Sequence, residues 1–369
     1  MPRVFHILCH SAAVYNASTW AVAFSGWHGE TARQLAARTS KYSFEVLSFD
    51  LINKQINKTE HGIKYLIFPR TFNLYGKIEN SSSLLAYLEA TVNKHDIVHI
   101  HGVKSFLTYK ILTLYSTNVV IQDHGSRPSV IDPLFYYNMR KVNKNVRMLY
   151  ALTTPAKQYF QQSLNLPANN ISVQTMGVDL NVFRPLSMNA ARVELNLPST
   201  GHLLLYTGQF NSFKGLPQII NAVDRLKRKF DVDLVVVGGK NSDNLYQYLK
   251  KKVRYVYPWL NHSRMLQFYT ATDALTYFWK NNLWGGPSVS VMEAMACNRG
   301  VVSNTLQFSP IPESPENGCY IPRTVENIEQ KLTDFLNNSS QVKTRNIAQK
   351  YFSWDIISKK TLAQYGLCD

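Results

Sequence analysis

Short apolar, β-rich runs alternate with amphipathic stretches along nearly the whole chain, and this alternation constrains the fold more than any other feature. Strands that are separated by helices form βαβ units and parallel sheets. The first series of runs is Val4–Cys9, Phe44–Phe49, Ile97–His101, Val119–Gln122 and Ile171–Thr175. The second series is Leu203–Thr207, Leu234–Val237, Ala274–Phe278 and Val301–Asn304. Two such series predict an α/β protein with two doubly wound domains.

Length and composition fit a folded protein of two domains. The 369 residues exceed what one ordinary core holds, and 45% hydrophobic with 17% charged residues is typical of globular chains. No apolar run reaches the roughly 18 residues that span a bilayer, and the first ten residues predict a buried strand rather than a signal peptide. Four scattered cysteines without metal-ligand spacing suit a reducing cytoplasm, where we expect the protein.

The net charge of +16 is spread over the chain. Residues 1–185 hold 19 Lys and Arg against 10 Asp and Glu, and the remainder holds 21 against 14. Nucleotide phosphates, an anionic membrane surface and nucleic acid are all partners for such a charge, and an unspecific soluble surface is the alternative. The basic residues are not interleaved with a nucleic-acid recognition module, so specific nucleic-acid binding is not expected.

The domain boundary is expected near Arg184–Pro185, before a polar stretch with few apolar residues. Residues 1–185 would form the first domain and residues 186–350 the second. Residues 351–369 would add a C-terminal helix, because the pattern from Tyr351 to Tyr365 is amphipathic.

The segment from Tyr206 to Gly215 has the pattern of a strand, a loop and the start of a helix. A buried strand ends at Gly208, Gln209 follows, and the helix begins near Gly215. Such a loop presents free backbone N–H groups and the positive end of a helix dipole to an anion. Lys214 adds an ammonium group there, so the segment suits a diphosphate. The alternative is an ordinary strand–loop–helix connection with a surface lysine.

The segment from Trp284 to Cys297, WGGPSVSVMEAMAC, is the most informative in the chain. Two glycines permit a close backbone approach, and the proline after them fixes the entry to a helix. Glu293 lies one turn into that helix, where its carboxylate can accept hydrogen bonds from both hydroxyls of a ribose. The alternative is a capping box from Ser290 to Glu293, in which the glutamate serves its own helix. The positions expected beside an anion are Gly285, Gly286, Ser288, Val289 and Ser290.

The stretch from Phe135 to Tyr150 also has an amphipathic pattern. As a helix it would gather Arg140, Lys141, Lys144 and Arg147 on one face. A helix that rests on an anionic membrane presents such a face, and a helix packed on its own domain with a solvated basic face explains the pattern equally well. Both interpretations stay open.

Taken in order, these motifs resemble the retaining glycosyltransferases of family 4, which have the GT-B fold. The motifs of the second half are Lys214–Gly215, VVVGGK at Val235–Lys240, the strand at Asp273 and EAMAC at Glu293–Cys297. Those of the first half are HDIVHIHG at His95–Gly102 and VVIQDHGS at Val119–Ser126, followed by a hinge-like MGVDLNVFRP at Met176–Pro185. The tail resembles the family's C-terminal helix that crosses back to the first domain. No single motif is specific, but the ordered set is, and it covers nearly the whole chain.

The resemblance implies two Rossmann-like domains that face each other across a cleft, with the acceptor on the side of the first and the donor on the second. Lys214 would bind the donor diphosphate and Glu293 the ribose. His124 would face the transferred sugar from the first domain. The loop Gly26–Glu30, which includes Gly29, would close over the donor phosphates.

The implied reaction transfers a hexose from a UDP or GDP sugar to a saccharide or lipid-linked acceptor, with retention at the anomeric carbon. No protein nucleophile is expected, because the departing diphosphate helps to deprotonate the acceptor on the same face. Positioning and stabilisation of negative charge would supply the catalysis. No metal and no other cofactor is implied. Residues 12–28 and 125–133 would contact the acceptor, and a lipid-linked acceptor would bring the enzyme to the inner face of the membrane.

Two positions depart from the family pattern. The family usually has a second glutamate eight positions before Glu293, where this chain has Gly285, and an arginine beside the glycine of the phosphate loop, where it has Gln209. Neutral Gln209 still donates hydrogen bonds, but charge-assisted bonds are roughly twice as strong. We favour a site that is tuned to an unusual donor, with sugar contacts from Asn281, Asn282 or Trp284.

Alternatives stay open for the function and for single residues. A non-catalytic relative that binds a nucleotide sugar would explain Gly285 and Gln209. An isomerase of the same architecture would act on the sugar nucleotide itself, although the sequence shows no clear acid–base pair for it. His124 in its turn could bond only to backbone, and Glu30 could serve only the start of a helix over Thr31–Ala37.

Overall fold

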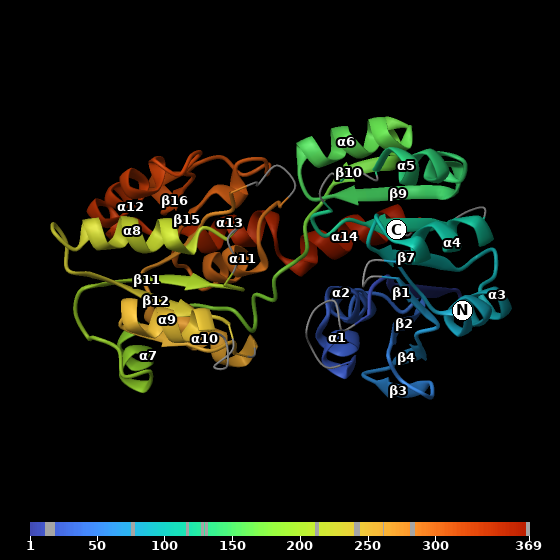
Figure 1. The fold of residues 1–369 in the computed structure, drawn as a ribbon, viewed down its shortest axis with the longest axis horizontal. Helices are drawn as coiled ribbons and strands as arrows, with labels where there is room; N and C mark the ends of the chain where they lie inside the picture. The colour runs from blue at the N-terminus through green and yellow to red at the C-terminus, as the bar shows by residue number, and fades with distance from the viewer. Residues whose placement is uncertain are drawn as a thin grey trace. The chain divides into compact units, whose positions relative to one another are not determined.

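The computed structural model divides the chain into two compact units, Met1–Met176 with Ser358–Asp369 and Gly177–Ile357 (Figure 1). It describes residues 1–11, 19–74, 78–115, 118–126, 129, 132–210, 214–239, 244–260, 262–280 and 285–366. The predicted sugar contacts Asn281, Asn282 and Trp284 lie outside the described residues, as do parts of both segments predicted to contact the acceptor.

Within the described residues, the first unit is built on an eight-stranded sheet with the order β10-β9-β8-β7-β1-β2-β4-β3. Neighbouring strands pair in parallel, except that β3 and β4 are antiparallel. The strands are β1 (Arg3–Leu8), β2 (Ser43–Asp50), β3 (Ile56–Glu60), β4 (Ile63–Pro69), β7 (Ile97–His101), β8 (Val119–Gln122), β9 (Val146–Ala151) and β10 (Ile171–Val173). A separate antiparallel pair consists of β5 (Phe72–Leu74) and β6 (Ile78–Asn80).

Helices connect these strands as the alternation predicts. They are α1 (Thr19–Ser25), α2 (Trp27–Ala36), α3 (Ser82–Thr91), α4 (Phe106–Leu114), α5 (Asp132–Arg140) and α6 (Thr154–Leu164). One face of the sheet packs against α2 and against the end of α14 (Trp354–Gln364), because Ala32, Leu35, Leu362 and Tyr365 share a core cluster with apolar side chains of the strands. The second half of α14 therefore belongs to the first unit.

The described residues of the second unit form a six-stranded parallel sheet with the order β13-β12-β11-β14-β15-β16. Its strands are β11 (His202–Thr207), β12 (Val232–Val237), β13 (Tyr255–Tyr257), β14 (Ala274–Tyr277), β15 (Gly300–Ser303) and β16 (Cys319–Tyr320). Its helices are α7 (Met188–Glu194), α8 (Leu216–Leu226), α9 (Asn244–Lys252), α10 (His262–Ala271), α11 (Val289–Ala296), α12 (Asn327–Asn337) and α13 (Thr344–Tyr351). All nine predicted strands are present in the two sheets, so the α/β prediction is confirmed.

The prediction of one amphipathic helix over Phe135–Tyr150 is wrong. Helix α5 ends at Arg140, a 3₁₀ turn follows at Asn143–Asn145, and Val146–Ala151 is strand β9, which lies between β10 and β8 in the sheet. Every residue of β9 is buried except Arg147, because the strand is covered on both faces. The continuous basic helical face that suggested a membrane surface is therefore not formed.

The boundary between the units lies between Met176 and Gly177 rather than at Arg184–Pro185. The Val178 N–H donates to the Phe352 carbonyl oxygen at 2.8 Å, and a Cβ at Gly177 would lie 2.4 Å from the Trp354 ring. These contacts tie the segment to the start of α14, which sequence patterns near Pro185 do not reveal. Helix α13 ends at Tyr351 and α14 begins at Trp354, so the predicted helix is interrupted at its start.

Among the described residues, no helix combines the length and the apolar character needed to cross a membrane.

Gly208 and Gly238 give a matched test of the packing at the carboxyl ends of β11 and β12. Their φ angles are +142° and +152°, so alanine is strained at both positions. A Cβ at Gly238 would lie 1.9 Å from the Gly208 carbonyl oxygen, whereas a Cβ at Gly208 would lie 3.7 Å from the Tyr277 ring. We expect Gly238→Ala to lower the free energy of unfolding by about 2 kcal/mol more than Gly208→Ala in urea denaturation. Equal losses would contradict this packing.

Candidate functional site

The order of the strands locates the candidate site in each unit. In the second sheet β12 and β13 extend to one side of β11, and β14, β15 and β16 extend to the other. In the first sheet the order reverses between β1 and β7. Ligands of open parallel α/β sheets bind outside the carboxyl ends of the strands where the order reverses. The loops after β11 and β14 therefore border the candidate site of the second unit.

The loop after β11 brings the backbone close to its neighbours at this edge. Gly208 donates its N–H to the Val237 carbonyl oxygen at 3.1 Å, and the exposed Gln209 accepts a hydrogen bond from the Tyr206 hydroxyl on its carbonyl oxygen at 3.2 Å. Gly215 is the N-cap of α8 with a φ of +63°, and a Cβ there would lie 2.5 Å from the Phe278 carbonyl oxygen. The first turn of α8 thus lies directly against the end of β14.

Lys214 is held between two aromatic side chains at the end of β14. Its ammonium group donates to the Tyr277 hydroxyl and lies 5.1 Å from the Tyr277 ring centroid and 4.9 Å from that of Trp279. Cations are attracted to the faces of aromatic rings at such distances. Tyr277 in turn stacks on Tyr206 with centroids 6.1 Å apart. The lysine predicted from the sequence is therefore oriented at the point where the strand order reverses.

Trp279 is a site residue that the sequence analysis missed. Its backbone is fixed by the buried Asn304, whose side chain accepts from the Trp279 N–H and donates to its carbonyl oxygen, both at 2.8 Å. The indole ring lies against Gly285, where a Cβ would approach it to 2.7 Å. The sequence did contain a signal for Trp279, because it is an aromatic residue immediately after the predicted strand Ala274–Phe278. The structure thus gives a steric reason for glycine at position 285, because a larger residue would displace the indole.

Helix α11 does not begin with the capping box from Ser290 to Glu293 that was considered as an alternative. Its N-cap is Ser288, whose hydroxyl accepts from the Val291 N–H at 3.3 Å, so Ser290 lies inside the first turn and the capping box is wrong. Glu293 is 5% exposed, and its Oε2 accepts a hydrogen bond of 2.6 Å from the Tyr269 hydroxyl of α10. Burial, and then the charge of Glu293, raise the pKa of Tyr269 well above its usual value. The tyrosine is therefore a neutral donor that orients the carboxylate.

His124 follows β8, beside the reversal of strand order in the first unit. Its ring stacks on Trp27 with centroids 4.5 Å apart, and its Nε2 shares a hydrogen bond of 3.1 Å with His101 Nδ1. The predicted alternative of backbone bonding alone is wrong, since the ring has side-chain partners. Burial lowers the pKa of His124 to about 3, so the imidazole is neutral at pH 7. It can donate or accept a hydrogen bond but supplies no positive charge.

The predicted loop Gly26–Glu30 is mostly helical. Gly26 is the N-cap of α2, which begins at Trp27, because buried residues at helical spacing continue back through the segment. Gly29 is buried, and a Cβ there would lie 2.6 Å from the Phe24 carbonyl oxygen, so glycine permits the close approach of α1 and α2. Glu30 pairs with Arg33 within α2. The role of Gly29 toward a donor stays a prediction.

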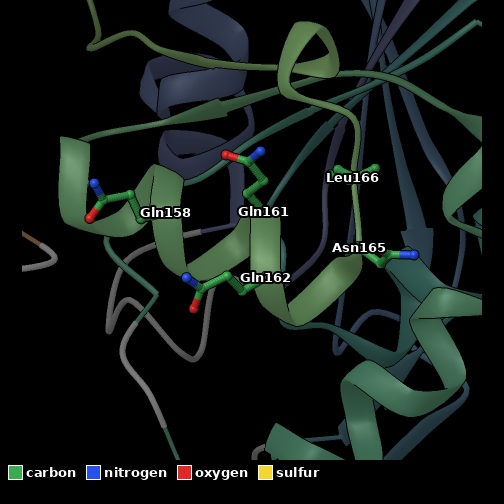
Figure 2. Close-up of a pocket in the computed structure, with 5 residues that line it drawn as sticks. All are labelled: Gln158, Gln161, Gln162, Asn165 and Leu166. Atoms are coloured by element: carbon green, nitrogen blue, oxygen red, sulfur yellow. The ribbon is translucent and has the colours of Figure 1, made fainter.

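A shallow hollow lies elsewhere on the first unit, along the exposed side of α6 (Figure 2). Its lining is Gln158, Gln161, Gln162, Asn165 and Leu166. None of these side chains is charged or titrates near neutral pH, so the hollow offers no acid, base or phosphate-binding group.

Comparison with known families agrees with this geometry. Residues 201–338 match the family described as Glycosyl transferases group 1, and this range contains both loops and helix α11. This part of the chain is therefore similar to the group 1 glycosyl transferases. Among curated relatives, the D-inositol 3-phosphate glycosyltransferase of Mycobacterium leprae is 25% identical over 249 residues, which are 61% of this chain and 55% of the relative. The Streptosporangium roseum enzyme of the same name is 29% identical over 149 residues, 36% of this chain and 33% of its own.

The chain thus aligns with a third to about half of the length of these curated relatives.

Solved structures are similar over nearly the whole chain. Sucrose-phosphate synthase from Thermosynechococcus elongatus is 16% identical with a TM-score of 0.73, covering 99% of this chain and 98% of that one. HepE from Anabaena, solved with UDP, is 15% identical with a TM-score of 0.70 and full coverage of both chains. The GT-B fold predicted from the motifs is confirmed by these similarities.

Proposed function

We propose that this chain transfers a hexose from a UDP or GDP sugar to a saccharide or lipid-linked acceptor, with retention at the anomeric carbon. One observation carries the proposal. Lys214 and Glu293 lie within the matched family range, and they follow β11 and β14, the two strands between which the strand order reverses. The UDP type of donor is supported by HepE, whose solved structures contain UDP and UDP-glucose.

The diphosphate of the donor would lie between the two helix N-termini. Lys214 supplies a positive charge that Tyr277 and Trp279 orient, and Gly208, Gln209 and Gly215 bring the backbone of the first loop close. The N-cap and first turn of α11 add further N–H groups from Ser288, Val289 and Ser290, and Gly286 adds one from the loop before them. Backbone amides at helix N-termini and a lysine are the groups that bind phosphates in many unrelated sites.

Glu293 would accept hydrogen bonds from the ribose hydroxyls. Its carboxylate already accepts one from Tyr269, which leaves other lone pairs, since a carboxylate has about four acceptor positions. His124 would contact the transferred sugar from the first unit as a neutral hydrogen-bonding group. Asn281, Asn282 and Trp284 remain candidates for further sugar contacts.

The transfer itself would need neither a protein nucleophile nor a metal ion. The leaving diphosphate accepts the proton of the attacking hydroxyl on the same face of the sugar, and Lys214 with the helix N-termini stabilises the charge that develops on the diphosphate. The protein then contributes mainly by holding donor and acceptor in place.

A non-catalytic nucleotide-sugar-binding protein is the second candidate. The contact of Trp279 with Gly285 favours it, because the indole occupies the position from which the usual second glutamate would extend. Turnover distinguishes the two candidates.

We predict that turnover depends on the charge of Lys214. Release of nucleoside diphosphate from UDP, GDP and ADP sugars would be measured with and without a membrane-lipid extract. We expect release from one donor, and a drop of ten- to a hundredfold in kcat/KM for Lys214→Met, because a charge-assisted hydrogen bond contributes about 1.5–3 kcal/mol.

The matched control is Lys229→Met, which removes the same charge just beyond the other end of α8 and should leave turnover unchanged. Stimulation by the lipid extract would support a lipid-linked acceptor. Donor binding without release from any donor would contradict the transferase and favour the second candidate.

We predict that Glu293→Gln lowers nucleotide affinity about tenfold while the melting temperature changes little. Glutamine can still accept the hydrogen bond from Tyr269, but it loses the charge that strengthens bonds to ribose. Calorimetric titration of the nucleoside diphosphate would measure the affinity, with the exposed Glu316→Gln as control. Unchanged affinity in Glu293→Gln would remove the ribose role.

A further inference from the structure

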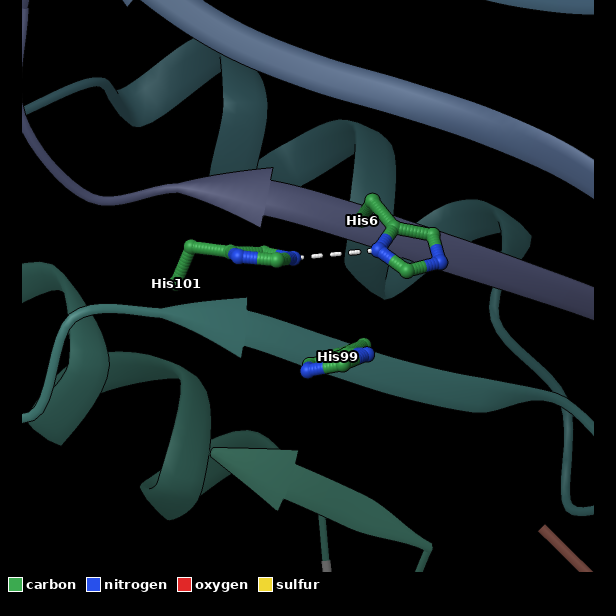
Figure 3. A group of neighbouring side chains, drawn as sticks. All are labelled: His6, His99 and His101. Atoms are coloured by element: carbon green, nitrogen blue, oxygen red, sulfur yellow. Dashed lines mark hydrogen bonds between the residues drawn. The ribbon is translucent and has the colours of Figure 1, made fainter. Parts of the chain in front are cut away.

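A cluster of three histidines lies inside the first unit, and the proposed transfer reaction does not use it. His6 is in the middle of β1, and His99 and His101 are in β7, the neighbouring parallel strand (Figure 3). His6 and His99 are register partners, and His101 is two residues further along β7, so all three side chains lie on one face of the sheet. This is the place where the strand order of the first unit reverses.

The three imidazoles are close enough to share one ligand. His6 Nδ1 and His101 Nε2 are 3.0 Å apart, and one ring nitrogen from each of the three residues lies within 4.8 Å of the others. The ring centroids of His99 and His101 are 4.5 Å apart, and those of His6 and His99 are 4.8 Å apart. The side chains are fully buried, with exposures of 0% for His6 and His99 and 1% for His101.

Buried ring nitrogens of the cluster lack hydrogen-bond partners among the described residues. These atoms are His6 Nε2 and His99 Nε2. A polar atom buried without a partner costs about 1–3 kcal/mol, so native proteins usually supply an atom such as His99 Nε2 with a bound water or ion. The hydrogen bonds from His124 to His101 and from His101 to His6 could in principle carry a proton. They do not form a relay, because the path would end at His6 Nε2, which is buried and has no partner among the described residues.

We propose that His6, His99 and His101 bind one divalent transition-metal ion of the class that imidazole prefers, with Zn²⁺ as the leading candidate. Neutral imidazole nitrogens are the ligands of zinc, copper, nickel and iron sites. The ion would take the place of the proton that His6 and His101 now share. Two zinc-bound nitrogens at about 2.0–2.1 Å from the metal in tetrahedral geometry are roughly 3.3 Å apart, close to the present spacing of His6 and His101.

Outer contacts already fix two of the ligands. His99 Nδ1 shares a hydrogen bond of 2.6 Å with the Tyr365 hydroxyl, and His101 Nδ1 shares one of 3.1 Å with His124 Nε2. Metal-bound histidines usually donate their second N–H to such a partner, which sets the tautomer and the ring orientation.

His28 is the candidate for a fourth ligand. Its ring lies 6.0 Å from that of His101, and both of its nitrogens are buried without hydrogen-bond partners among the described residues. A water molecule is the other candidate for that position. The ion would link β1 to β7 and, through His101, steady His124; it would be structural and take no part in the transfer of the sugar.

Metal content and stability of the tag-free full chain test the proposal. The protein would be stripped with a chelator, reloaded with Zn²⁺ and dialysed, and its zinc measured by mass spectrometry. We expect one zinc ion per chain and a melting temperature that falls after chelation and recovers with Zn²⁺. Zinc X-ray absorption should show nitrogen and oxygen but no sulfur around the ion.

The variants His6→Gln and His99→Gln should each weaken Zn²⁺ binding at least a hundredfold, while the exposed control His95→Gln should keep it. If a variant fails to fold, the X-ray absorption and melting experiments on the wild-type chain still decide the question. Less than about a tenth of an equivalent of zinc after reloading, sulfur ligands, or full binding in the folded variants would overturn the proposal. None of these outcomes affects the proposed sugar transfer.

Discussion

The reversal of strand order between β11 and β14 is the constraint on which the candidate site depends. Parallel strands end at one edge of the sheet, and the reversal leaves two of their loops side by side there. Glycines let these loops stay close to the edge: a Cβ at Gly238 would overlap the Gly208 carbonyl, and one at Gly215 would overlap that of Phe278. Gly215, directly after Lys214, thus lies against the end of β14.

The fold could be predicted largely from local patterns, and the failures have physical causes. Strands buried on both faces appear as continuous apolar runs, which is why all nine predicted strands were found. Strand β9 was missed because Arg147 and the basic residues before it also satisfy a helical period. The start of α2 was missed because the glycines at 26 and 29 suggested a loop, whereas Gly29 in fact allows tight packing on α1.

The sequence could predict a candidate site residue where that residue lies next to a turn. It could not predict contacts between side chains that are far apart in the sequence. Lys214 and Glu293 were predicted from their motifs, and the structure places them after β11 and β14. The hydrogen bond from Tyr269 to Glu293 and the aromatic contacts of Lys214 with Trp279 join different elements, so no local spacing reveals them. The histidine cluster is hidden for the same reason, since His6 and His101 are 95 positions apart.

The departures from the family pattern gain a partial explanation from these contacts. The indole of Trp279 lies against Gly285, so a side chain at position 285 would overlap it. Among the described residues, Gln209 accepts a hydrogen bond on its backbone carbonyl oxygen from the Tyr206 hydroxyl, which adds no charge to the site. The site is therefore expected to bind its diphosphate with fewer charges than is usual for the family.

A crystal structure of the full chain with the nucleoside diphosphate that it binds most tightly would test the central claim most directly. The account predicts density for the diphosphate within hydrogen-bonding distance of Lys214 Nζ and of the first-turn amides of α8 or α11, with the ribose beside Glu293. Density for the nucleotide at any other place in the second unit, with Lys214 still held against Tyr277 and Trp279 and no phosphate near it, would contradict the account.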